Sequence, residues 1–188
     1  MKNLKSIALA LVVVFATATA SAQTKKVDAT ASTINWVGKK VTGQHNGTVN
    51  LKAGTLIFKG DKLAGGTFTV DMTSLTATDL TGEYQGKLNG HLKSEDFFGT
   101  EKFPTATLVF KTIATKSKTL YTVTADLTIK DKTNPVTFDI TVNGNTATTA
   151  FNVDRTKYDI KYGSGSFFDN LGDKAISNEF ELAVALKF

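Results

Sequence analysis

The feature of this chain that most constrains its fold is an alternation of apolar and polar residues that recurs along most of the sequence. In the segment 121–130, the odd positions hold Tyr, Val, Ala, Leu and Ile, and the even positions hold Thr, Asp and Lys. Residues 136–142 and 179–188 alternate in the same way. Successive side chains of a β-strand point to opposite faces, so this period predicts strands with one apolar and one polar face. The 30 Thr residues fit this interpretation, because β-branched side chains favour a half-buried pleated surface.

Further alternating runs and tight turns extend this pattern. Asn143-Gly144-Asn145 separates two of the runs, and Asn-Gly is a strong signal for a β-hairpin. Eight or nine strands with short connections predict an antiparallel meander that closes on itself, because an open sheet would leave two unpaired edges. The predicted fold class is all-β, with a single antiparallel barrel of about eight strands. The remaining strands are predicted at 33–39, 48–52, 55–59, 67–72, 105–111 and 146–153.

Two segments lack the alternation. Within 78–104, Tyr84, Leu88 and Leu92 recur every four residues, which predicts a short amphipathic helix that docks on the barrel as a cap. The segment 154–178 carries aromatic residues among glycines and is predicted to be a long ordered loop with at most one helical turn. Long loops of this kind often carry function.

The N-terminus has the pattern of a secretory signal peptide over residues 1–22. Lys2 and Lys5 precede an apolar run at 7–16, and Ala20-Ser21-Ala22 fits a cleavage site. We therefore expect residues 23–188 to form the mature protein as one domain, in the periplasm or secreted. The chain has no Cys, so we expect no lipid anchor, no disulfide and no thiolate chemistry.

Charge and motif content narrow the function further. Without Lys2 and Lys5, 20 basic residues face 17 acidic ones and form no basic cluster, so no nucleic-acid partner is predicted. The sequence lacks the nucleophile, zinc-protease, phosphate-loop and dinucleotide motifs, and no catalytic carboxylate pair stands out. A metal site built on the two histidines would need His45 and His91 to lie close together in space. The stretch Gly163–Ser166 is interpreted as a flexible turn rather than a catalytic site. We therefore predict no enzyme, no metal and no cofactor.

The inward-facing apolar residues are the candidates for binding. An eight-stranded barrel is either filled by its own side chains or holds one small ligand, and the pattern alone leaves both open. The candidate lumen residues are Trp36, Phe58, Phe68, Val70, Phe110, Val123, Leu127, Phe138 and Phe151.

Three sequence blocks resemble one known family. These are HLKSEDFF at 91–98 with FPTAT at 103–107, ADLTIK at 125–130 with TNPV at 133–136, and DRTKYDI at 154–160. In this order and spacing they resemble the YceI-like family, secreted bacterial proteins that bind polyisoprenoids or other lipids. The resemblance covers about residues 27–188.

The resemblance implies a lipocalin-like barrel whose lumen holds an isoprenoid or other long-chain lipid. It implies a non-enzymatic role in sequestration or transport, without stable membrane insertion. His91, Arg155 and Tyr158 are then candidates for the polar mouth of the site. For Arg155, a structural ion pair is the alternative.

Two other classes remain as alternatives. An integral eight-stranded outer-membrane barrel would show the same alternation with its apolar face toward lipid, although one Trp and four Tyr are few for two aromatic girdles. A secreted hydrolase would depend on His45 or His91. The sequence predicts neither the oligomeric state nor the identity of the lipid.

Overall fold

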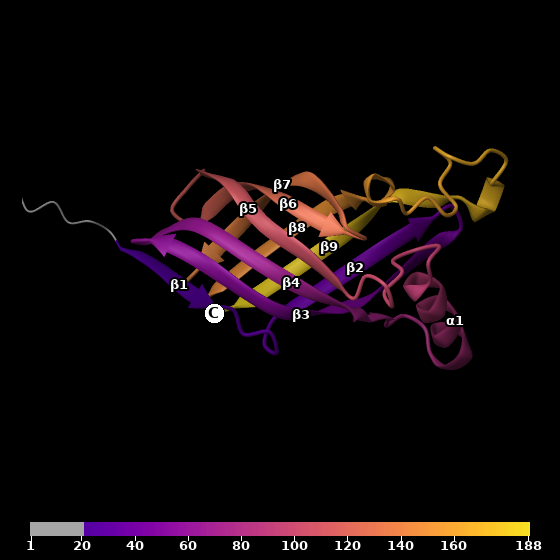
Figure 1. Cartoon of the computed structure of the whole chain (residues 1–188), viewed down its shortest axis with the longest axis horizontal. Coiled ribbons are helices and arrows are strands. Elements are labelled where there is room, and N and C mark those ends of the chain that lie inside the picture. The colour runs from indigo at the N-terminus through magenta and orange to yellow at the C-terminus, as the bar shows by residue number, and fades with distance from the viewer. Residues whose placement is uncertain (1–20) are drawn as a thin grey trace, which may run out of the picture.

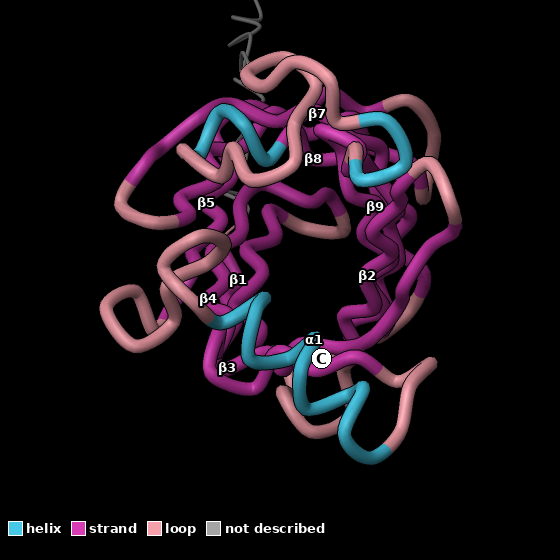
Figure 2. Tube along the Cα trace, turned by 90° about the vertical axis from the view of Figure 1, so that its right-hand side faces the viewer, coloured by secondary structure: helices cyan, strands magenta, loops and turns pink. Residues whose placement is uncertain are grey.

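The computed structural model describes residues 21–188, which form a closed antiparallel β-barrel with one helix (Figures 1 and 2). The strand order is β1-β3-β2-β9-β8-β7-β6-β5-β4, and pairing of β3 with β4 closes the ring. Eight strands build the barrel, and β1 is an extra strand that pairs with β3 alone. The strands are β1 (Ala22–Lys26), β2 (Thr33–Lys40), β3 (Gly43–Lys59), β4 (Lys62–Ala77), β5 (Thr105–Thr115), β6 (Leu120–Ile129), β7 (Lys132–Asn143), β8 (Thr146–Asp154) and β9 (Ile176–Lys187).

The predicted all-β barrel of about eight strands with a short capping helix is confirmed. The helix α1 spans Gly82–Lys93, and two short 3₁₀ turns, η1 (Arg155–Tyr158) and η2 (Gly172–Lys174), lie in the long β8–β9 connection. That connection was expected to hold at most one helical turn. The two turns are three and four residues long, too short to leave a helical period in the sequence.

The alternation sends apolar side chains inward and polar side chains outward. Along β6, every odd residue from Tyr121 to Ile129 is buried, while the even residues are partly exposed. On the outside, Thr hydroxyls pair across strands, as between Thr124 and Thr137 at 3.1 Å. A barrel in a lipid bilayer needs the opposite arrangement, with an apolar outer band. The structure therefore does not support the outer-membrane alternative.

Strand boundaries differ from the prediction most in β3 and β4. The strand predicted at 67–72 extends over Lys62–Ala77 in β4. The predicted strands 48–52 and 55–59 are one strand of 17 residues, with a register shift opposite β4 between Leu51 and Ala53. Its first residues, Gly43–Gly47, have no apolar alternation and are held by pairing with β2. The strand β1 was not predicted because AQTKK carries no apolar pattern.

The predicted signal peptide lies almost wholly outside the described residues, which begin at 21. The expected cleavage after Ala22 falls at the first residue of β1, so cleavage would leave four of its five residues. Within residues 21–188, no helix is long and apolar enough to cross a membrane.

The two ends of the barrel differ in what covers them (Figure 1). One end carries α1, the segment 94–104 and the β8–β9 connection, and Figure 2 looks onto this end. The other end has the tight turns after β3, β5 and β7, near the C-terminus. The first end therefore carries the longest connections between the strands of the barrel.

Candidate functional site

A cavity of about 190 Å³ lies inside the barrel at the end covered by α1. Its walls are the inward faces of β2, β3, β4, β5, β6 and β9, and its cover is α1 with the segment that follows. Most lining side chains are apolar because they occupy the inward positions of the alternation. Lys39, Lys40 and Glu179 are charged strand residues that also line the cavity. The apolar strand residues at the cavity include Ile34, Trp36, Val49, Val70, Met72, Leu75, Ala106, Leu127, Ile129, Phe180 and Leu182.

Trp36 is a fixed part of this wall. Its indole Nε1 donates a hydrogen bond to the Thr48 carbonyl oxygen at 3.3 Å. The ring lies against Gly47, where a Cβ atom would come within 2.6 Å of the ring and 1.9 Å of the Thr76 carbonyl oxygen. Gly47 therefore lets β3 approach β4 closely and leaves the space that the indole fills.

The helix α1 is tied to the end of β4 by two amide side chains. The Asn89 side chain accepts from the Ala77 amide at 2.8 Å and donates to the Thr76 hydroxyl at 3.0 Å. The Gln85 side chain donates to the Ala77 carbonyl oxygen at 2.7 Å. These contacts satisfy backbone groups at the strand end. Neither residue was predicted from the sequence, because both lie outside the apolar stripe.

The predicted apolar stripe of the helix docks only in part. Leu88 and Leu92 line the cavity, whereas Tyr84 is 74% exposed. No residue of α1 is fully buried, and no side chain caps its first turn. The helix is therefore a lightly attached cover and adds little to the core.

Aromatic rings surround His91 at the rim of the cavity. The imidazole lies edge-on to Phe97 at 5.1 Å and to Tyr162 at 4.5 Å between ring centroids. Phe98 meets Phe180 of β9 at 6.1 Å, which joins the segment after α1 to the strand wall. These rings close the space between α1 and β9.

Arg155 is a buried cation at the cavity wall. It is 2% exposed and donates to the carbonyl oxygens of Ser177 at 2.8 Å, Ile160 at 2.8 Å and Ile176 at 3.1 Å. Its guanidinium also lies 5.5 Å from the Phe97 ring centroid. Burial lowers the pKa of Arg155, but guanidinium groups remain charged in proteins.

No carboxylate of residues 21–188 forms a salt bridge with Arg155. The expected structural ion pair is therefore wrong, and backbone carbonyl oxygens take its place. A guanidinium has five N–H donors, and three of them are used here. The cavity thus has an apolar body with a positive charge in its wall.

His45 also lies at the cavity, where it contacts a carboxylate. Its Nδ1 lies 2.8 Å from Asp79 Oδ2, and the Asn46 amide donates to the other oxygen of Asp79 at 3.2 Å. Desolvation raises the pKa of Asp79, and these hydrogen bonds more than offset it, so the pKa is lowered. Although His45 and His91 both line the cavity, residues 21–188 contain no group of three or more His, Asp or Glu placed to hold a metal.

The structure divides the nine predicted lumen residues between two regions. Trp36, Val70 and Leu127 line the cavity. The other six lie outside the lining and fill the barrel toward its other end, because the alternation gives the direction of a side chain but not its height along the barrel axis. They are Phe58, Phe68, Phe110, Val123, Phe138 and Phe151.

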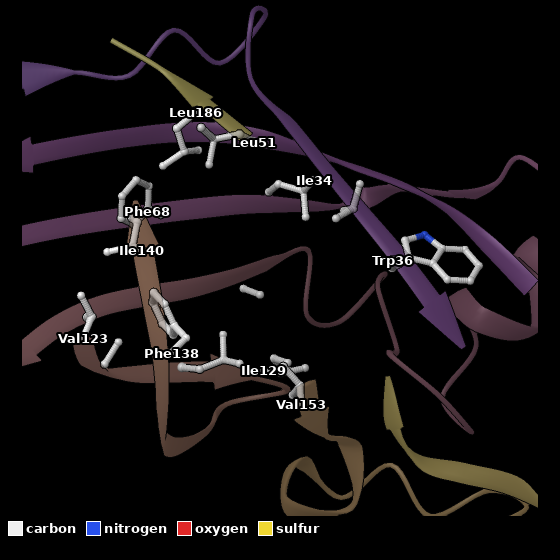
Figure 3. Close-up of a cluster of buried hydrophobic side chains, with 14 of the residues drawn as sticks. Ile34, Trp36, Leu51, Phe68, Val123, Ile129, Phe138, Ile140, Val153 and Leu186 are labelled. Atoms are coloured by element: carbon white, nitrogen blue, oxygen red, sulfur yellow. The ribbon is translucent and has the colours of Figure 1, made fainter. Parts of the chain in front are cut away.

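The packed half of the barrel, the half away from α1, holds several aromatic rings, and Figure 3 labels Phe68 and Phe138 among them. Phe68, Phe110, Phe138 and Phe151 form a chain with centroid distances of 5.5, 6.0 and 4.5 Å. Val123 is fully buried beside them on β6. This half of the barrel is therefore filled by its own side chains, whereas the α1 end encloses a cavity.

Of the three predicted mouth residues, His91 and Arg155 line the cavity and Tyr158 does not. Tyr158 is 1% exposed, and its hydroxyl has no hydrogen-bond partner among residues 21–188. Burial raises the pKa of Tyr158 to about 12. It is the last residue of η1, and its side chain packs in the core.

The stretch Gly163–Ser166, expected to be a flexible turn, is instead anchored. Ser164 is fully buried, and its hydroxyl donates to the Asn178 side chain at 2.6 Å. The Ser164 carbonyl oxygen accepts from the amides of Phe167 and Phe168 at 3.1 and 3.0 Å. These bonds make the rim of the cavity an ordered structure.

Cavity residues that the sequence analysis did not select include Met72, Phe97, Phe98, Phe180 and Leu182. Two of them carried a usable signal, since Phe180 and Leu182 lie on the apolar face of the alternating run 179–188. Phe97 and Phe98 lie in the block that carries the family resemblance. Met72 also carried a signal, because it follows Phe68 and Val70 at period two in the predicted strand 67–72.

Comparison with known proteins agrees with this architecture. Residues 26–188 match the YceI-like domain. The chain belongs to the YceI-like family. Curated relatives match over a short segment only: the UPF0312 proteins of Staphylococcus aureus strains MRSA252 and USA300 are 54% and 50% identical over 56 residues, which is 30% of this chain and 30% of each relative. The match thus spans about a third of the length of these relatives.

Solved structures share the YceI-like fold over most of the chain. BcnA of Burkholderia cenocepacia is 25% identical with a TM-score of 0.68, over 85% of this chain and 98% of its own. A polyisoprenoid binding domain from Saccharophagus degradans is 16% identical with a TM-score of 0.58, over 86% and 95%. The Campylobacter jejuni YCEI protein is 16% identical with a TM-score of 0.54, over 74% and 84%. The similarity to the last two concerns the fold alone.

Proposed function

We propose that this YceI-like protein binds one amphiphilic lipid, a polyisoprenoid or similar molecule, with the tail in the cavity and the polar head at the rim. It acts without catalysis, by sequestering or carrying the lipid. The observation that carries this proposal is the apolar cavity of about 190 Å³ under a lightly attached helix. A polyisoprenoid binding domain among its structural neighbours supports the lipid class.

The energy for binding comes from the tail. Each methylene group removed from water contributes about 0.8 kcal/mol, or roughly 25 cal/mol per Å² of apolar surface. An apolar wall gives this gain without directional contacts, so the affinity depends more on the size of the tail than on its chemistry. Trp36, Val70 and Leu127 are the predicted lumen residues that would contact it.

The head group is proposed to lie toward Arg155 and His91. Arg155 forms no salt bridge with a carboxylate among residues 21–188, although the charge of Asp154 acts on it, and a phosphate or carboxylate head would supply a direct partner. His91 stands at the rim between Phe97 and Tyr162. An acidic amphiphile therefore fits better than a neutral one.

The proposed location is the periplasm or the medium, after removal of a signal peptide at residues 1–22. The basic start, apolar run and Ala20-Ser21-Ala22 of the sequence support this. In that location a lipid in transit needs a shield from water, which a covered barrel provides.

Lipid mass spectrometry of the protein purified without detergent tests the proposal. We expect one co-purified amphiphile per chain, which Val70→Asp abolishes because a carboxylate in the apolar wall opposes a hydrocarbon tail. Val109→Asp is the matched control, since Val109 is 38% exposed on the outer face of β5. A folded wild-type protein that carries no lipid and takes up none from vesicles would refute the proposal.

A further inference from the structure

We propose that a wall of aromatic rings divides the barrel interior, so that this chain holds a lipid tail of about 15–20 carbons and no more. This inference rests on the proposed function and adds the length class of its ligand. The wall is made of Phe68, Phe110, Phe138 and Phe151.

The wall begins where the cavity ends. On β4, Val70 lines the cavity, and the next inward residue, Phe68, does not. From Phe68 the rings continue to Phe110 on β5 at 5.5 Å, to Phe138 on β7 at 6.0 Å and to Phe151 on β8 at 4.5 Å. The row therefore crosses the barrel from β4 to β8.

Two glycines allow the rings of this wall to pack against the backbone of neighbouring strands. A Cβ at Gly54 would come within 2.8 Å of the Phe68 ring, and a Cβ at Gly66 within 2.8 Å of the Phe110 ring. The rings therefore pack directly on backbone, and a residue with a side chain at either position would displace them. This close packing fixes the β4 and β5 rings against the strands.

The opposite side of the barrel is closed by aliphatic residues. Leu51 of β3 and Leu186 of β9 are 6% and 5% exposed, and Figure 3 shows them at the same end of the view as Phe68, away from Trp36. Ala125 and Val123 of β6 are fully buried. Rings from one side and leucines from the other thus fill the section of the barrel below the cavity.

The volume of the cavity sets the length of the tail. The cavity offers about 190 Å³ to the centres of water molecules. One water needs roughly 10–15 Å³ of such space and occupies about 30 Å³ of liquid, so the contents amount to roughly 400–550 Å³. A methylene group is close to a water in volume, which gives room for about 15–20 carbons.

Binding of prenyl phosphates with ten, fifteen, twenty, thirty and forty carbons to the full chain tests this directly. The head is constant in this series, so only the tail changes. Within the cavity, affinity is expected to rise by up to roughly fourfold per buried methylene. Beyond twenty carbons the rest of the tail stays outside, and affinity should level off within about threefold.

The Phe138→Ala variant opens the wall at the stacked Phe138–Phe151 pair. It should raise the affinity for the thirty-carbon tail by at least about tenfold. It should change the affinity for the fifteen-carbon tail by less than about threefold. Phe58→Ala is the control, because Phe58 contacts Phe188 away from the wall and should leave the length limit unchanged. Ala106→Leu reduces the volume of the cavity and should shorten the tail that binds most tightly. This variant tests the length limit if Phe138→Ala does not fold.

The outcomes separate the two proposals. If no prenyl phosphate of any length binds, the proposed function fails. If wild-type affinity rises by more than about tenfold between twenty and forty carbons, the lipid-binding function stands and the wall is refuted. A length limit that Phe138→Ala and Ala106→Leu both leave in place also refutes it.

Discussion

The two halves of this barrel are built from the same alternating strands, yet one is packed and the other is hollow. In the packed half, inward positions hold large rings that touch across the interior, as Phe110 and Phe138 do at 6.0 Å. On β4 and β5, the inward positions of the hollow half hold Val70 and Ala106, which are smaller than Phe68 and Phe110 of the packed half. On these two strands, residue size at inward positions, rather than the strand pattern, therefore decides which part of the interior is filled.

The two halves also differ in the segments that cover their ends. The packed end is closed by tight turns, while the hollow end carries a helix with no fully buried residue and a connection anchored by Arg155 and Ser164. A site that must admit a ligand needs such a cover, because local opening requires few buried contacts.

The largest expected contrast is between two Phe→Ala variants. Phe138→Ala, in the packed half, should lower the free energy of unfolding by about 3–5 kcal/mol, because it leaves a cavity among fixed rings. Phe180→Ala, at the existing cavity, should cost roughly 2 kcal/mol or less, because its ring already borders open space. Urea unfolding measures both, and equal losses would contradict the division into halves.

Arg155→Met tests the anchor of the hollow end. It leaves three carbonyl oxygens without their donor, and we expect a loss of about 3 kcal/mol. Hydrogen exchange should rise first in residues 155–178, before the packed half responds. Arg155→Lys keeps the charge but loses the planar set of N–H donors, so its free energy of unfolding should lie between those of the Met variant and the wild type. A Met variant as stable as the wild type would contradict this account.

Tyr158 makes the free energy of unfolding depend on pH in the alkaline range. Its pKa is raised to about 12 by burial, so the folded state keeps the proton that the unfolded state releases near pH 10. Its contribution is fully present below pH 10 and is lost as the pH rises through 12, a change of roughly 2–3 kcal/mol. Tyr158→Phe should remove this dependence in a thermal melt between pH 9 and 12, and an unchanged profile would contradict it.

The smallest effect is expected at the cover. Asn89→Ala removes two hydrogen bonds between α1 and β4 and should cost about 1–2 kcal/mol. Hydrogen exchange of residues 82–93 should accelerate while β6 stays protected. Lys87→Ala, whose ion pair with Glu83 lies on the exposed face, is the matched control and should leave exchange nearly unchanged.

Much of the fold follows from the sequence because period two is a direct signature of a strand. The barrel, its nearly complete set of strands and the capping helix were predictable from the alternation and from the Tyr84–Leu88–Leu92 spacing. The strand β1 and the first residues of β3 were not, since both depend on pairing with a neighbouring strand and carry no pattern.

The site was predictable only in part. The alternation shows that Phe138 and Leu127 face inward, but not that Leu127 lies at the cavity and Phe138 in the packed half. Height along the barrel depends on strand register, such as Val123 opposite Phe138, which no single strand encodes. The carbonyl partners of Arg155 and the amide anchors of α1 likewise join different elements of the fold, which the pattern within one element does not encode.

The central claim is that a lipid tail enters the cavity at the α1 end, and Trp36 reports on it directly. Trp36 is the only Trp of the chain and lines the cavity. Titration with a lipid brominated on its tail should quench Trp36 fluorescence with saturation at one lipid per chain, and Val70→Asp should abolish the quenching. Binding of the lipid without quenching of Trp36 would place the tail elsewhere and contradict the account.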